Sequence, residues 1–96
     1  MEILFFVSHP ESAPLLAGLA RACARQKVSW GCFLTGHGVR VLQDPDAAGL
    51  VCAAPAGAVV CEHSWTRHAA GPCPLPLGSQ TDSSALAASA LRIISL

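Results

Sequence analysis

The chain has 96 residues, of which 52% are hydrophobic and only 12% are charged, and its formal net charge is zero. This length fits one domain, residues 1–96, with a core that is easily filled. The charge balance excludes a strongly basic nucleic-acid-binding surface, and no apolar run is long enough to span a membrane. Because few charges remain to cover so small a domain, we expect a homo-oligomer or hetero-oligomer that covers apolar surface.

The cysteine content indicates the redox environment. The chain has five cysteines, an odd number that cannot all pair within one monomer. The first residues lack the basic segment and the apolar length of a secretory signal. We therefore expect a cytoplasmic protein whose thiols are mostly reduced.

The first third of the chain predicts a strand, a helix and a second strand. The apolar run at 3–7 is typical of a strand buried on both faces of a parallel sheet. Ser12 is a suitable helix N-cap, Pro14 is tolerated in the first turn, and apolar residues then recur at helical spacing. Residues 28–34 form the second predicted strand, which ends in a glycine-containing loop at 35–38. This order is that of a βαβ unit with parallel strands.

The middle of the chain is less regular. For residues 39–56 we expect a short second helix that crosses back over the sheet. Val39–Leu42 could begin a helix, and Ala47–Ala54 could be helix or strand. Asp44-Pro45-Asp46 is a turn signal within this segment. A third apolar run, Ala58–Cys61, predicts the third strand.

The last third predicts a loop, a helix and a final strand. Three prolines at 71–78 exclude regular structure there. Thr81 or Asp82 is the expected cap of a helix over 83–90, and 91–96 is typical of a strand. The whole pattern predicts an α/β fold with flavodoxin-like layering, in which helices flank a small, mostly parallel sheet of four to five strands.

The end of the third strand carries the main candidate site. Cys61 is followed by His63 and Arg67, which can stabilise a thiolate as a base, a cation or both. If the following residues form a helix, its N–H groups would stabilise the thiolate further. We therefore expect Cys61 to be open to solvent and reactive. The alternative is a cysteine that only fills space at the end of the strand.

Other residues could line a pocket around this cysteine. His9 and His37 follow the first and second strands, and the carboxyl ends of parallel strands lie at one edge of the sheet. Each could instead be a surface histidine. Trp65 is either a lid over the cysteine or an interface residue, whereas Trp30 fits the core. Cys73 is either a resolving thiol for Cys61 or an exposed bystander.

A metal site is the competing chemistry. Cys61, His63, His68 and Cys73 are soft or borderline ligands within thirteen residues and could hold zinc or copper. The spacing matches no common zinc pattern, and neither CxxC nor HxxxH occurs.

Several of these segments are similar to the DsrE-like sulfur-relay family, which includes DsrE/DsrF/DsrH and TusB/TusC/TusD. The similarity lies in the apolar strand that ends at Cys61 and is followed by Arg67, in the loop at 33–39, and in the closing segment Leu77-Gly78-Ser79-Gln80-Thr81. His37 stands where the family often has an acid, and His68 replaces a glycine.

The resemblance implies a DsrE-like domain, often oligomeric, with a cysteine at the position of Cys61 that carries a persulfide. The implied activity is that of a sulfur carrier or sulfurtransferase that needs no cofactor and works with sulfur donor and acceptor proteins. Because only some family subunits keep the cysteine, a non-catalytic subunit of a relay complex is the alternative.

Overall fold

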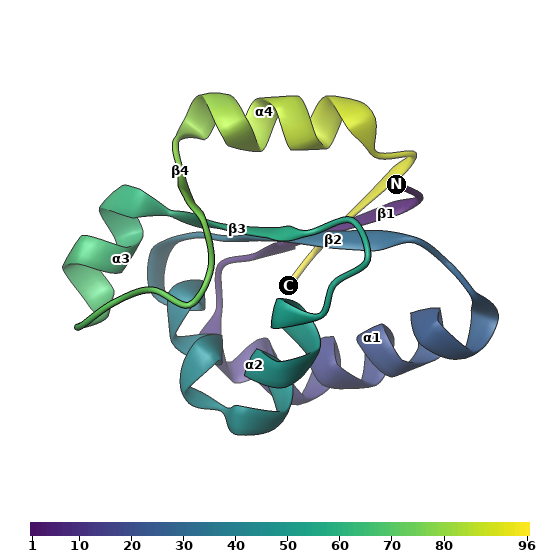
Figure 1. Ribbon diagram of the computed structural model, residues 1–96, viewed down its shortest axis with the longest axis horizontal. Helices are drawn as coiled ribbons and strands as arrows, with labels where there is room; N and C mark the ends of the chain where they lie inside the picture. The colour runs from purple at the N-terminus through teal and green to yellow at the C-terminus, as the bar shows by residue number, and fades with distance from the viewer.

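A single parallel sheet organises the protein. The computed structural model describes residues 1–96 and arranges five strands in the order β4-β3-β2-β1-β5 (Figure 1). All four strand pairings are parallel. The strands are β1 (Ile3–Val7), β2 (Trp30–Leu34), β3 (Ala58–Cys61), β4 (Leu77–Gly78) and β5 (Arg92–Ser95). The predicted α/β class with a small parallel sheet is confirmed.

Helices cover both faces of this sheet and give a three-layer fold. Helices α1 (Ala13–Gln26) and α2 (Pro45–Cys52) lie on one face, and α4 (Gln80–Ser89) lies on the other (Figure 1). Helix α3 (Glu62–His68) is short and extends from the carboxyl end of β3. None of the helices has the length and apolar character needed to cross a membrane.

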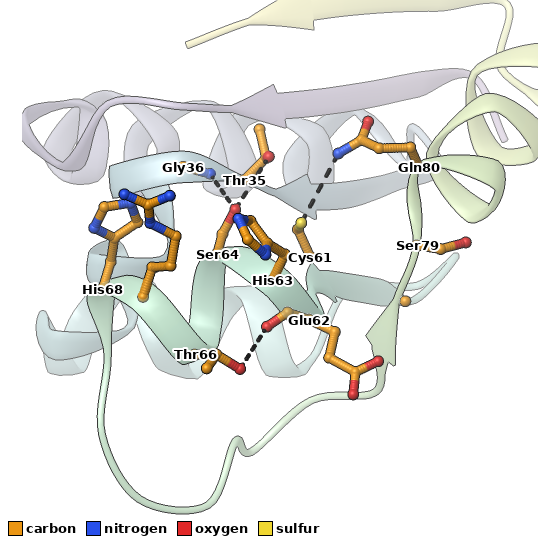
Figure 2. Close-up of a pocket in the computed structure, with 12 residues that line it drawn as sticks. Thr35, Gly36, Cys61, Glu62, His63, Ser64, Thr66, His68, Ser79 and Gln80 are labelled. Carbon is orange, nitrogen blue, oxygen red and sulfur yellow. Dashed lines mark hydrogen bonds between the residues drawn. The ribbon is translucent and has the colours of Figure 1, made fainter.

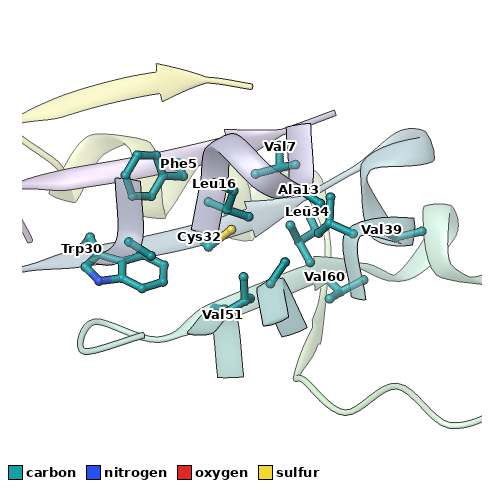
Figure 3. Close-up of a cluster of buried hydrophobic side chains, with 14 of the residues drawn as sticks. Phe5, Val7, Ala13, Leu16, Trp30, Cys32, Leu34, Val39, Val51 and Val60 are labelled. Atoms are coloured by element: carbon teal, nitrogen blue, oxygen red, sulfur yellow. The ribbon is translucent and has the colours of Figure 1, made fainter. Parts of the chain in front are cut away.

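The larger core lies between the sheet and the α1–α2 layer. It is a cluster of 15 buried residues to which both strands and helices contribute (Figure 3). The rings of Phe5 and Trp30 meet edge to face with centroids 5.6 Å apart, so Trp30 is a core residue as predicted. Burying each large apolar side chain contributes about 1.5–3 kcal/mol.

A smaller core lies on the opposite face, under α4. Its buried members are Leu4, Phe33 and Cys61. Successive strand residues point to opposite faces of a sheet, so β1 sends Leu4 to this core and Phe5 to the larger one. Cys61 therefore faces the α4 layer.

The segment at 39–56 contains the end of one helix and the whole of another, where a single short helix was predicted. A 3₁₀ helix, η2 (Gly36–Gln43), includes Val39–Leu42, and α2 begins separately at Pro45. The side chain of Asp44 caps α2 by accepting hydrogen bonds from the N–H groups of Asp46 and Ala47, at 3.0 and 3.4 Å. This cap separates the two helices because it requires an extended backbone at residue 44.

The N-terminal caps of α1 and α4 agree with the predictions to different extents. Ser12 is the N-cap of α1 by position, but its side chain makes no capping hydrogen bond. Helix α4 is capped by Ser79, earlier than the predicted Thr81 or Asp82. Asp82 is instead the third helical residue, and its carboxylate accepts a hydrogen bond from Ser79 N at 2.7 Å, which completes a capping box.

The proline-rich loop ends in a strand that was not predicted. Leu77 and Gly78 form β4 and pair with Val60 and Cys61 of β3. Proline lacks a backbone N–H, but Leu77 and Gly78 follow the last proline and keep theirs. Val60 N also donates a hydrogen bond to the carbonyl of Pro76 at 2.9 Å. The exclusion of regular structure is therefore wrong for residues 77 and 78.

The turn after β2 lies directly against the end of β1. Thr35 N donates to the carbonyl of Val7 at 2.9 Å. Gly38 approaches the same carbonyl so closely that a Cβ at residue 38 would overlap it. The same Cβ would also lie only 2.8 Å from Ser8 Cα. This close approach fixes the position of Thr35 and Gly36 at the sheet edge.

Candidate functional site

A polar pocket of about 810 Å³ lies at the carboxyl edge of β2, β3 and β4. Helix α3 forms one wall, and the beginning of α4 forms another (Figure 2). This edge is where ligands bind in open parallel sheets. The pocket is lined by Thr35, Gly36, Cys61, Glu62, His63, Ser64, Thr66, Arg67, His68, Gly78, Ser79 and Gln80.

Cys61 connects the sheet to the pocket. It is the last residue of β3 and the N-cap of α3, and only 5% of its surface is exposed. It packs with Leu4 and Phe33 on one side and contributes to the pocket wall on the other. The expectation of a thiol open to solvent needs correction, because Cys61 is a buried residue that borders the pocket.

Polar groups from three elements surround the sulfur. The hydroxyl of Ser64 accepts a hydrogen bond from Gly36 N at 2.8 Å and lies 3.5 Å from the hydroxyl of Thr35. Gln80 Nε2 donates to Cys61 Sγ at 3.8 Å, as Figure 2 shows. The end of β2, helix α3 and helix α4 therefore meet at this cysteine.

These contacts determine the ionisation of the thiol. Burial alone would raise the pKa of Cys61, but hydrogen bonds from the Ser64 and Thr35 side chains and from the Ser64 and His63 N–H groups lower it overall. By contrast, burial raises the pKa of Cys32 to about 12. Cys61 is therefore the cysteine that the surrounding groups favour as a thiolate.

His63 and Arg67 lie in the same pocket, as expected from their spacing. They are one helical turn apart on α3, and both are exposed. The groups that lower the pKa of Cys61 are hydrogen-bond donors, however, and not these two side-chain charges. The side chains of His63 and Arg67 are thus available to bind a ligand in the pocket.

His68 and His37 form a pair at the edge of the pocket. Their rings are 4.1 Å apart between centroids, and His68 lines the pocket while His37 does not. Arg40 Nε donates to the carbonyl of His68 at 3.1 Å. Desolvation and the positive charges of His37, Arg40, Arg67 and His63 lower the pKa of His68.

His9 does not line the pocket. It is exposed beyond the end of β1, where Nδ1 lies 3.1 Å from the hydroxyl of Ser8. In the sheet order, β2 separates β1 from β3. His9 is thus at the expected edge of the sheet but outside the Cys61 pocket.

Trp65 and Cys73 belong to the other side of α3. Trp65 packs against the larger core, and its ring N–H donates to the carbonyl of Gly71 at 3.0 Å. It lines a separate cavity of about 120 Å³, so it is not a lid over Cys61. Cys73 packs against the same core, whereas Cys61 belongs to the α4-side core. Both are free thiols that face different sides of the sheet.

The proposed metal ligands do not converge. No group of three or more histidine, cysteine, aspartate or glutamate side chains is arranged to hold a metal ion. The set Cys61, His63, His68 and Cys73 is therefore not assembled. The helical geometry of α3 separates the two histidines, and Cys73 lies against the other core.

Sequence reasoning missed the hydrogen-bonding residues of the site. Ser64 follows Cys61 by three residues, a spacing that places two side chains on one side of a helix. This spacing predicts a contact between Ser64 and Cys61 only if the residues after Cys61 form a helix. Gln80 has no local signal, because the sheet pairing of β4 brings it to the cysteine.

Comparisons of the chain with models of known protein families, with curated proteins and with solved structures find no match.

Proposed function

We propose that the protein is a cysteine-based sulfur carrier that holds a persulfide on Cys61 and passes the sulfur to a thiol of a partner protein. The observation that carries this proposal is a thiol of lowered pKa at the wall of a polar pocket. The resemblance to DsrE-like proteins points to the same role for this cysteine. The five free cysteines fit a reducing compartment, and we propose the cytoplasm.

The hydrogen-bond donors around Cys61 suit both steps of sulfur transfer. In loading, the Cys61 thiolate attacks the outer sulfur of a donor, so a lowered pKa raises the fraction of the reactive form. In delivery, a partner thiolate attacks the outer sulfur, and Cys61 leaves as a thiolate. The same low pKa makes it a better leaving group. Ser64, Thr35 and Gln80 can donate hydrogen bonds to the anionic sulfur in each state.

Intact-mass measurement tests the proposal directly. The reduced protein is incubated with a persulfide donor, and its mass is measured before and after treatment with a reductant. We expect a reversible gain of one sulfur atom that is absent in Cys61→Ser and present in the matched variants Cys52→Ser and Cys73→Ser. A protein that gains no sulfur, or gains it equally in Cys61→Ser, would contradict the carrier role and favour a non-catalytic subunit.

We also propose that the protein associates through the β5 edge of the sheet. β5 is the outermost strand on this side, and Ile93 within it is 51% exposed. Leu91, directly before β5, is 81% exposed. Exposed apolar side chains beside an open strand edge favour contact with another chain. Light scattering during gel filtration should give a mass above that of a monomer, and Ile93→Lys should lower it. A monomer at high concentration would contradict this assembly.

A further inference from the structure

Basic side chains gather where helix α3 contacts η2, beside the Cys61 pocket. This site holds two of the chain's six lysine and arginine residues and three of its four histidines. We call this group the cationic patch after its two permanently charged arginines, of which Arg67 lines the Cys61 pocket and Arg40 lines the neighbouring cavity of about 120 Å³. Its members are His37 and Arg40 of η2 and His63, Arg67 and His68 of α3.

No carboxylate neutralises the cationic patch. The single ion pair of the protein joins Arg21 to Asp46, between α1 and α2. Glu62 lines the same pocket, but its side chain points away from His68 in Figure 2 and forms no ion pair. Asp82 lies near the opposite wall, where its carboxylate is occupied by Ser79. An arginine without an ion-pair partner at the wall of a pocket, with hydrogen-bonding histidines beside it, attracts an anionic ligand.

The size of the pocket indicates an organic ligand. Its volume of about 810 Å³ lies within the range of roughly 300–1,000 Å³ that is typical of sites for small organic molecules. An inorganic sulfur oxyanion would leave most of this space unfilled. A molecule of the size of a short peptide can instead extend from the cationic patch to Cys61.

We infer that the sulfur donor of Cys61 is a low-molecular-weight persulfide with carboxylate groups, which the cationic patch binds. This inference rests on the proposed carrier function and adds the chemical class of the donor. Arg67 is the central residue, because it is permanently charged, lines the pocket and has no ion-pair partner. The carboxylates of the donor bind at the patch, and its persulfide points toward the cysteine.

The transfer step is balanced without an oxidant or a reductant. The Cys61 thiolate attacks the outer sulfur of the donor persulfide, and a new S–S bond forms as the bond within the donor breaks. The electron pair of that broken bond leaves on the inner sulfur. This thiolate takes the proton of the outer sulfur, so the products are a Cys61 persulfide anion and the free thiol of the donor.

Two donors of different charge test the inference. Glutathione persulfide carries carboxylates, whereas 2-hydroxyethyl persulfide is uncharged apart from its sulfur. Loading rates with each are measured by intact mass for the wild type, for Arg67→Gln and for the control Arg25→Gln. Arg25 is an exposed arginine at the end of α1, outside the pocket.

For Arg67→Gln we expect about a tenfold slower loading from glutathione persulfide, the usual scale for one charge-assisted hydrogen bond. Loading from 2-hydroxyethyl persulfide should change less than about twofold, because that donor has no carboxylate for the patch to bind. Arg25→Gln should resemble the wild type with both donors. Equal effects of Arg67→Gln on the two donors, or no effect, would overturn the inference and leave the carrier function intact. No loading of the wild type from either donor would overturn both.

Binding of an unreactive analogue separates recognition from chemistry. Glutathione sulfonate keeps the carboxylates but cannot transfer sulfur, and it is titrated into Cys61→Ser by calorimetry. We expect binding that weakens at high salt and is lost when Arg67→Gln is added, but not when Arg25→Gln is added. Absence of binding, or binding that is independent of Arg67, would contradict a site for carboxylate-bearing donors.

Discussion

The hydroxyl of Ser64 accepts a hydrogen bond from the backbone N–H of Gly36 at 2.8 Å. This contact joins helix α3 to the turn after β2, which are 28 residues apart in the sequence. Because the hydroxyl is held in this way, its own hydrogen can be directed to the sulfur of Cys61, whose pKa it lowers. The lowered pKa of this thiol thus depends on a contact between two segments that meet only in the folded protein.

Replacement of Ser64 should make Cys61 less reactive. Ser64→Ala removes a hydrogen-bond donor that favours the thiolate, so the pKa of Cys61 rises and a smaller fraction is ionised at neutral pH. The rate of alkylation by iodoacetamide, measured across pH, should keep its plateau but reach it at higher pH. Ser89→Ala, at the far end of α4, is the control and should leave the profile unchanged. An unshifted profile for Ser64→Ala would exclude this role of the hydroxyl.

Two glycines in different surroundings predict opposite effects of a substitution by alanine. Gly38→Ala places a methyl group against the carbonyl of Val7, so we expect a loss of about 1–3 kcal/mol in the free energy of unfolding. Gly18→Ala lies within helix α1 with open space around it and should stabilise the protein by about 0.5–1 kcal/mol. Urea denaturation of both variants gives the comparison. Equal free energies of unfolding for the two variants would contradict this prediction and show that the start of η2 moves to make room for the methyl group at residue 38.

Loss of the cap of α2 should destabilise the protein. Asp44→Ala removes the side chain that accepts hydrogen bonds from the first turn of the helix, which typically costs about 0.5–2 kcal/mol. Asp44→Asn or Asp44→Ser should restore most of the stability, because both side chains can cap a helix. The free energy of unfolding from denaturant titration is the measurement. An Asp44→Ala protein as stable as the wild type would show that this cap contributes nothing.

The stability of the protein should decrease in mild acid through His68. Its pKa in the folded state is lowered by desolvation and by neighbouring positive charges, so between that value and the ordinary value near 6.5 the unfolded chain binds more protons. The folded state therefore loses stability as the pH falls through this range. In His68→Gln this contribution is absent, so the pH dependence should be shallower below the ordinary pKa and unchanged at alkaline pH. Parallel stability curves for the two proteins would contradict this origin.

Much of the layout was predictable because it depends on local patterns. The apolar run at 3–7, the helical spacing that follows it and the apolar run before Cys61 each define an element within about ten residues. Parallel strands with intervening helices then follow from the chain order. The α/β class and the position of Cys61 at the end of β3 could therefore be predicted from the sequence.

Other features were not predictable, because their signals are weak or distant. Strand β4 has only two residues and follows prolines, so Leu77 and Gly78 acquire their conformation by pairing with β3. Ser79 caps α4 although Thr81 and Asp82 are equally good capping residues by type. His9 and Cys73 could not be excluded from the pocket, because sequence gives no distance between loops.

The sequence by itself determined the class of fold, the order of the elements and the cysteine at the end of the third strand, since these depend on residue periodicity over short stretches. Only the tertiary structure decided which groups surround that cysteine. Ser64, Thr35 and Gln80 come from three elements, and the cationic side chains come from two. Their positions are set by strand order and helix packing, because hydrogen bonds and charges act over a few ångströms in space, whatever the separation along the chain.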